Sequence, residues 1–126
     1  MSVANAHGEP NGFRTPSSNI FCQLYSEASS ISLRCDIMDL DKRSIPPKPR
    51  DCEFDWGQGF EIDNKQMNGY RICISDSVMD ESLPILGYSE TWQLKGFTCK
   101  LERSGLTCFN EFRHGFIISR KHQKLF

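Results

Sequence analysis

The chain has 126 residues and a formal net charge of −1, a length that suits one domain. Nucleic-acid-binding domains normally carry a basic excess or a basic stripe, so we do not expect a nucleic-acid partner. No apolar run approaches the roughly 20 residues that span a bilayer as a helix, so no transmembrane segment is predicted.

Residues 1–12 are small and polar, and we interpret them as a flexible lead-in to a single domain over residues 13–126. Within the lead-in, Ala4 and Ala6 form the small-x-small pattern that precedes signal-peptidase cleavage. The pattern predicts cleavage before His7. Because no apolar region lies upstream of it, we expect that residues 1–6 retain only the end of a signal peptide whose remainder has been removed. The expected location is periplasmic or secreted.

Short segments in which apolar and polar residues alternate, separated by turns rich in Gly, Pro, Asn and Ser, predict β-strands. These segments are residues 20–25, 31–37, 54–60, 70–74, 90–94, 97–101, 106–110 and 115–119. Gly57 and Gly59 indicate a bulge or tight bend in the third of them. No long window shows a helical apolar period. We therefore expect an all-β fold, a small antiparallel β-sandwich or an open barrel.

Three segments fit this strand pattern poorly. Residues 38–51 are charged and proline-rich, which predicts a surface loop. Residues 76–84 form an acidic loop, and residues 83–88 are predicted to be irregular or to lie at a sheet edge. The basic cluster at the C-terminus, which contains Arg120 and Lys121, is interpreted as a solvated tail.

The six cysteines include no C-x-x-C pair, and their even number in a small chain indicates disulfides rather than a metal or thiol site. Six cysteines allow 15 pairings, and predicted hairpins favour pairing between neighbours. We expect the bridges Cys22–Cys35, Cys52–Cys73 and Cys99–Cys108.

Several strings together resemble a family of small exported bacterial domains of unknown function. They are FRTPS at 13–17, LRCDI at 33–37, DC at 51–52 with DWG at 55–57, GLTC at 105–108 and HGF at 114–116. The resemblance spans residues 13–126 and implies export and disulfides, but it implies no activity. The family pattern has glycine where this chain has Ser18 and Arg113.

The most site-like cluster is His114 with Arg113 and Arg120, which could bind an anion or a carboxylate. The alternative is a turn histidine beside two surface arginines. The histidines lack metal-ligand spacing, and no G-x-S-x-G, Gly-rich phosphate loop or H-E-x-x-H motif is present. We therefore expect no cofactor, no metal and no enzymatic activity.

The sequence favours a non-enzymatic bacterial binding protein, an inhibitor or immunity-type protein that blocks a secreted toxin or a cell-wall hydrolase. Charged loops on a rigid β-scaffold are common recognition elements. The expected contact residues are Asp76, Asp80 and Glu81, with Arg113 and His114. We expect a monomer or a small homo-oligomer.

Two alternative functions remain open. Trp56 and Trp92 could form an aromatic platform for a glycan or for the cell wall, although such rings most often belong to the core. A small hydrolase that uses His114 is the third hypothesis.

Overall fold

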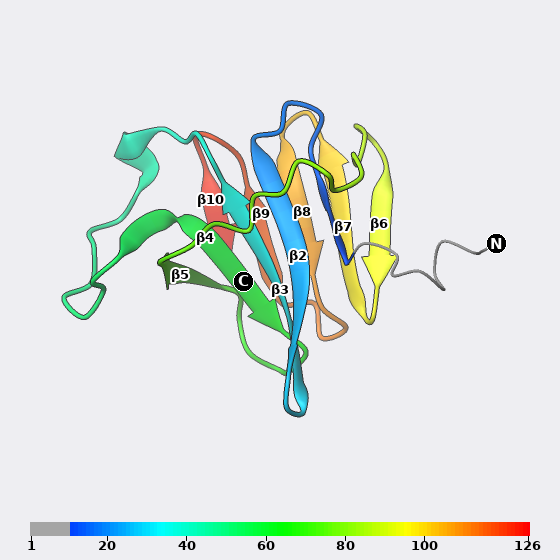
Figure 1. Ribbon diagram of the computed structural model, residues 1–126, viewed down its shortest axis with the longest axis horizontal. Coiled ribbons are helices and arrows are strands. Elements are labelled where there is room, and N and C mark those ends of the chain that lie inside the picture. Colours follow the sequence, from blue (N-terminus) through cyan, green and yellow to red (C-terminus); the bar gives the residue numbers. More distant parts are fainter. Residues whose placement is uncertain (1–10) are drawn as a thin grey trace.

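The computed structural model describes residues 11–126, which form ten strands in two five-stranded antiparallel sheets that pack face to face (Figure 1). In spatial order, the first sheet contains β1 (Gly12–Arg14), β2 (Ile20–Glu27), β3 (Ser30–Ile37), β4 (Asp55–Asp63) and β5 (Tyr70–Ile74). The second contains β10 (Gln123–Leu125), β9 (Gly115–Ile118), β8 (Gly105–Phe109), β7 (Phe97–Glu102) and β6 (Thr91–Leu94). The all-β prediction is confirmed, and of its two architectures the chain adopts the sandwich.

Both sheets are meanders, so their turns collect at two ends of the sandwich. One end, which we call the loop end, carries residues 15–19, 38–54, 103–104 and 119–122 (Figure 1). The short helix η1 (Lys42–Ser44) lies in the second of these loops. The opposite end, the hairpin end, carries residues 28–29, 64–69, 95–96 and 110–114. In the described part of the chain, no helix is long and apolar enough to cross a membrane.

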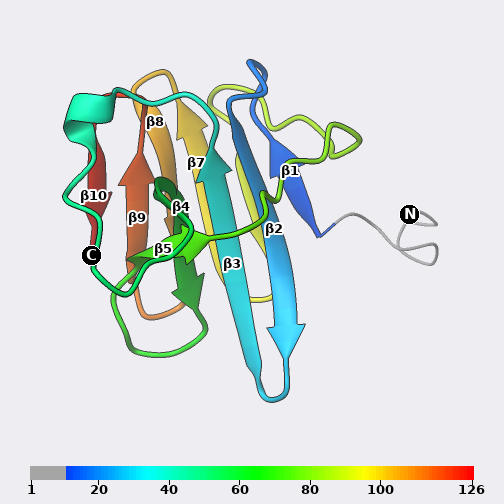
Figure 2. The same ribbon diagram turned by 60° about the vertical axis from the view of Figure 1, so that its left-hand side comes forward.

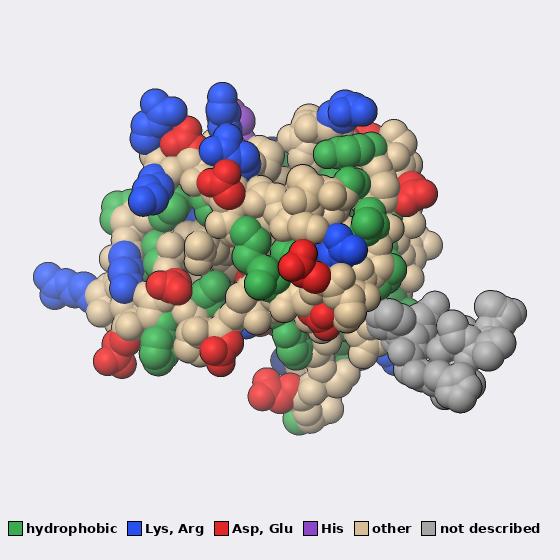
Figure 3. Space-filling model, turned by 45° about the horizontal axis from the view of Figure 1, so that its top comes forward, with side chains coloured by type: hydrophobic (Ala, Val, Ile, Leu, Met, Phe, Trp, Pro, Cys, Tyr) green, Lys and Arg blue, Asp and Glu red, His purple; other side chains and the backbone are tan. Residues whose placement is uncertain are grey.

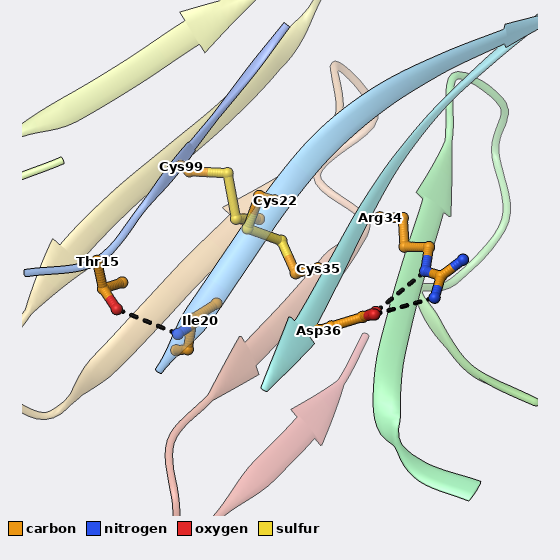
Figure 4. The surroundings of a disulfide bond; sticks show 8 residues. Thr15, Ile20, Cys22, Arg34, Cys35, Asp36 and Cys99 are labelled. Atoms are coloured by element: carbon orange, nitrogen blue, oxygen red, sulfur yellow. Dashed lines mark hydrogen bonds and ion pairs between the residues drawn. A yellow bond between two sulfur atoms is a disulfide. The ribbon is translucent and has the colours of Figure 1, made fainter. Parts of the chain in front are cut away.

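Two disulfides lie at the centre of the core. Cys22 faces Cys35 across β2 and β3, and Cys99 faces Cys108 across β7 and β8, each pair with a Cα–Cα distance of 4.1 Å. Directly opposed residues of antiparallel strands lie only about 4.5–5.5 Å apart, so the register brings each pair of cysteines within bridging distance. The two bridges meet between the sheets, all four cysteines being 0% exposed (Figure 4). The sulfurs of three of them lie within 4.8 Å of one another, but because they are bonded in pairs they do not form a metal site.

The third disulfide joins Cys52, at the end of the loop 38–54, to Cys73 of β5. Cys73 is exposed, as its position out of phase with the large apolar side chains predicts. All three predicted bridges are therefore confirmed. The bulge is confirmed as well, because the register between β4 and β5 shifts between Trp56 and Gly59.

The solvated-tail prediction for the C-terminus is wrong. Residues Gln123–Leu125 form β10, which pairs with β9, and Phe126 exchanges two backbone hydrogen bonds with Gly115. The segment is short and polar and its strand lies at a sheet edge, so alternation gave no signal. At the other terminus β1 begins at Gly12, the last residue of the predicted lead-in. The predicted cleavage pattern lies outside the described residues.

Ser18 and Arg113 both adopt left-handed backbone conformations, with φ of 59° and 65°. Each lies in a turn, Ser18 between β1 and β2 and Arg113 between β8 and β9. Glycine adopts this conformation without the steric cost that a Cβ atom brings. The conformation agrees with glycine at both positions in the family pattern that the sequence resembles.

Candidate functional site

The acidic segment after β5 crosses the outer face of the first sheet. We call residues 76–86 the strap. It runs from the end of β5 over β3 and β2 and reaches the edge strand β1 (Figure 2). An acidic loop was expected over residues 76–84, and an irregular or sheet-edge segment over residues 83–88. The structure fixes the strap to the sheet at two places, the second of them at the sheet edge.

The first anchor is an ion pair on the outer face of β3, between the buried Asp36 and the partly exposed Arg34. Arg34 donates to both carboxylate oxygens of Asp36, at 3.0 and 2.9 Å (Figure 4). The backbone N–H of Val78 donates to the same carboxylate at 3.0 Å, and Arg34 also donates to the carbonyl of Asp76. Gln23 of β2 donates to the carbonyl of Val78 at 2.9 Å. Since Asp36 is 0% exposed, these bonds satisfy a charge that would be costly to bury alone.

The second anchor combines apolar packing with backbone pairing. Val78 and Leu83 are buried against Phe21, a β2 residue that points outward, and form a small second core. Arg14 of β1 donates its backbone N–H to the carbonyl of Pro84 at 2.9 Å and accepts from Leu86 at 2.8 Å. A parallel bridge between Arg14 and Ile85 makes this part of the strap an extension of the sheet edge.

Between the anchors the strap forms an exposed acidic turn, residues 79–82. The Ser82 hydroxyl donates to the Asp80 carboxylate at 2.6 Å and the Ser82 N–H at 2.9 Å, which lowers the pKa of Asp80. Glu81 is exposed beside it, and Met79 is 54% exposed. Asp76 is also exposed, but it lies at the first anchor, so the three predicted carboxylates share the strap without forming one cluster.

Arg113 and His114 lie in the β8–β9 turn at the hairpin end. The Asn110 side chain holds this turn by accepting from the N–H groups of Phe112 and His114 at 2.8 and 3.1 Å. The Arg113 guanidinium lies over the Phe109 ring, 5.8 Å from its centroid. Within residues 11–126, no hydrogen bond or ion pair joins this turn to the strap.

The structure does not bring Arg120 to this pair, so the three-residue anion site expected from the sequence is not formed. Arg120 follows β9 at the loop end, whereas Arg113 and His114 precede β9 at the hairpin end. Arg120 instead pairs with Asp39 at 3.0 Å.

The two tryptophans lie in different sheets. Trp56 of β4 donates its indole N–H to the carbonyl of Pro46 at 3.1 Å. Trp92 of β6 packs on the Phe13 ring, with 5.2 Å between the ring centroids. Both rings therefore have structural contacts, and no aromatic platform shared by them is built.

Sequence reasoning missed Arg34, Asp36 and Phe21, which hold the strap. A signal was present, since Phe21 interrupts the alternation of Ile20, Cys22 and Leu24. A large apolar residue in the outward phase indicates that the outer face is covered.

Comparison with known protein families gives a match over residues 1–126 to the model of a family described as a family of unknown function (DUF6636). No curated protein and no solved structure matches the chain.

Proposed function

The chain belongs to DUF6636, a family of unknown function, and from its geometry we propose that it is an exported bacterial protein that binds another protein through the acidic turn of the strap. The observation that carries the proposal is the double anchoring. The turn is held by Asp36 on one side and by Arg14 on the other. A preformed turn loses little conformational entropy when a partner binds.

The composition of the turn supports a protein partner. Asp80 and Glu81 supply negative charge. Met79 in the turn and Ile85 of the adjoining second anchor remain 54% and 52% exposed. Exposed methionine beside charge is common at protein-binding surfaces, because its flexible side chain adapts to the partner. Negative charge accelerates association with a basic surface.

We infer further that the partner is a secreted toxin or a cell-wall hydrolase and that binding blocks its active-site cleft. Three disulfides support an oxidising location such as the periplasm. A rigid acidic turn fits a basic cleft. Arg113 and His114 would contact such a partner only through a second patch, because their turn belongs to the other sheet.

The proposal is tested by affinity capture with the oxidised protein on a solid support. The test variant reverses the charge of Asp76, Asp80 and Glu81 by substitution with lysine. A matched control reverses three exposed carboxylates elsewhere whose side chains make no hydrogen bond within residues 11–126, namely Glu27, Asp51 and Glu53.

We expect a protein from the periplasmic or secreted fraction that binds wild type and control alike and binds the strap variant at least roughly tenfold more weakly. The purified partner is then assayed for enzymatic activity with and without equimolar protein. If the strap variant and the control lose the same affinity for the partner, the acidic turn is rejected as the contact. Retained binding without loss of partner activity would reject inhibition and leave the binding function in place.

A further inference from the structure

A second surface, separate from the strap's acidic turn, lies at the loop end of the sandwich. It is an open hollow of about 450 Å³ between the turns that join the strands of the two sheets. Its walls are the loop 15–19 from the first sheet and the turns 102–105 and 119–122 from the second. Tyr88, which follows the strap, completes the rim.

The rim is positively charged although the whole chain has a net charge of −1. Arg103, Arg120, Lys121 and His122 line it, against the single carboxylate of Glu102. Figure 3 shows Lys and Arg side chains gathered along this end of the molecule. Arg120 is already paired with Asp39. In the part of the chain that the structure describes, Arg103 and Lys121 have no carboxylate partner.

The two unpaired cations lie on different turns of the rim. Arg103 lies over the Tyr88 ring, 4.8 Å from its centroid, and Tyr88 remains 42% exposed. This contact orients the guanidinium at the rim. Lys121 lies on the β9–β10 turn. The separation favours a ligand that carries several spaced negative charges over a single small anion.

The floor of the hollow is apolar but closed. Ile37 and Ile118 are 0% exposed, Leu101 is 3% exposed and Ile20 is 6% exposed. The floor thus offers no channel that could enclose an acyl chain or bury most of a small ligand, as dedicated small-molecule pockets do. A ligand must lie across the rim, where charge and the Tyr88 ring provide the contacts.

We propose that this hollow binds an acidic polypeptide segment, with carboxylates on Arg103 and Lys121 and an apolar or aromatic side chain against Tyr88. Charge complementarity identifies the segment as acidic. The exposed Tyr88 ring favours a polypeptide, because a polyphosphate chain has no apolar group to place there. The site is independent of the acidic turn, which would bind a basic surface.

The probe is a fluorescein-labelled peptide of alternating glutamate and leucine, measured by anisotropy with the full oxidised chain. The hollow variant is Arg103→Glu with Lys121→Glu. The matched control is Arg50→Glu with Lys65→Glu, two exposed cations outside the hollow. Both variants have the same net charge, so any difference between them reports position.

We expect the peptide to bind wild type and control with equal affinity. Its affinity for the hollow variant should be lower by about tenfold or more, because two attractive contacts become repulsive. Affinity should fall between about 0.01 and 0.15 M NaCl, as the Debye length shortens from roughly 30 to 8 Å. Tyr88→Ala should also weaken binding. Circular dichroism checks that each variant is folded.

Three results would overturn the proposal. The first is that the peptide does not bind at low salt. The second is that both double variants lose the same affinity for the peptide, and the third is that an inorganic polyphosphate of the same charge binds as tightly as the peptide. The last would make the surface a general polyanion site. The strap variant leaves the hollow unchanged, so it should bind the peptide like the carboxylate control variant, which has the same net charge. Failure of either proposal can therefore be recognised separately.

Discussion

Replacing Asp36 by asparagine tests how firmly the strap is held to the first sheet. Removing one partner of a buried ion pair costs about 3–5 kcal/mol. Here the Asp36 side chain is 0% exposed, but that of Arg34 keeps 17% exposure, and asparagine still offers an oxygen to the Val78 N–H. We therefore expect a loss of about 2–3 kcal/mol in the free energy of unfolding, equivalent to roughly 6–12 °C in Tm.

The measurements are urea unfolding with the disulfides intact and hydrogen exchange at the Val78 amide. Exchange should accelerate in Asp36→Asn, since its acceptor is weakened and the strap opens more often. Asp39→Asn is the matched control. Asp39 also pairs with an arginine, Arg120, but its side chain is 71% exposed, so the change should stay within about 0.5 kcal/mol.

Equal unfolding free energies for the two variants, with unchanged protection of Val78, would refute the reasoning that Asp36 anchors the strap. If the anchor is weakened as expected, affinity for the partner should also fall, because the acidic turn would have to be ordered on binding. That link joins the stability of the first sheet to the proposed function.

Three further outcomes are expected. Arg113→Gly should raise the free energy of unfolding by about 0.5 kcal/mol in thermal unfolding. The relief of the left-handed conformation (φ 65°) outweighs the extra entropy that glycine gives the unfolded chain. A lower Tm would show that stacking on Phe109 dominates. The Asp41 carboxyl should titrate with a pKa of about 2 by NMR, because the side chain and then the backbone N–H of Arg43 donate to it. The contribution of this carboxylate to stability is complete above the ordinary pKa of 3.8 and is lost as the pH falls through about 2. Arg43→Ala should return the pKa of Asp41 towards 3.8, and an unchanged pKa would contradict the assignment. Opening the Cys52–Cys73 bridge with a double serine variant should cost about 3 kcal/mol and expose the loop 38–54 to protease, and unchanged cleavage would argue against its anchoring role.

The elements that the sequence predicted are those with one face in the core. Alternation along β3, with Leu33, Cys35 and Ile37 inward, reports burial directly. The bridge Cys22–Cys35 followed because a hairpin opposes the two residues. The charged rim of the hollow, by contrast, comes from turns that are separated in the chain. The strand order of the second sheet places the turns of Arg103 and Lys121 at the same end, and the packing of the two sheets adds the loop 15–19.

The strap illustrates why the rest could not be predicted. Its apolar anchors, Val78 and Leu83, are five residues apart in an acidic, irregular segment and fit neither a strand nor a helix period. They pack on a face that alternation assigns to solvent. Likewise, Arg113 and Arg120 are close in the sequence, but the residues between them are extended in β9, which places the two at opposite ends of the sandwich.

The disulfides pair the cysteines strictly in the order in which they occur along the chain, first with second, third with fourth and fifth with sixth. Two of the bridges also close between neighbouring strands of one sheet, and the third joins the loop 38–54 to β5 of the first sheet. In a chain that is oxidised as it emerges from a translocation channel, every cysteine therefore meets its correct partner before a later one arrives. Such a chain can mature with a thiol oxidase alone, without the reshuffling that non-consecutive bridges require.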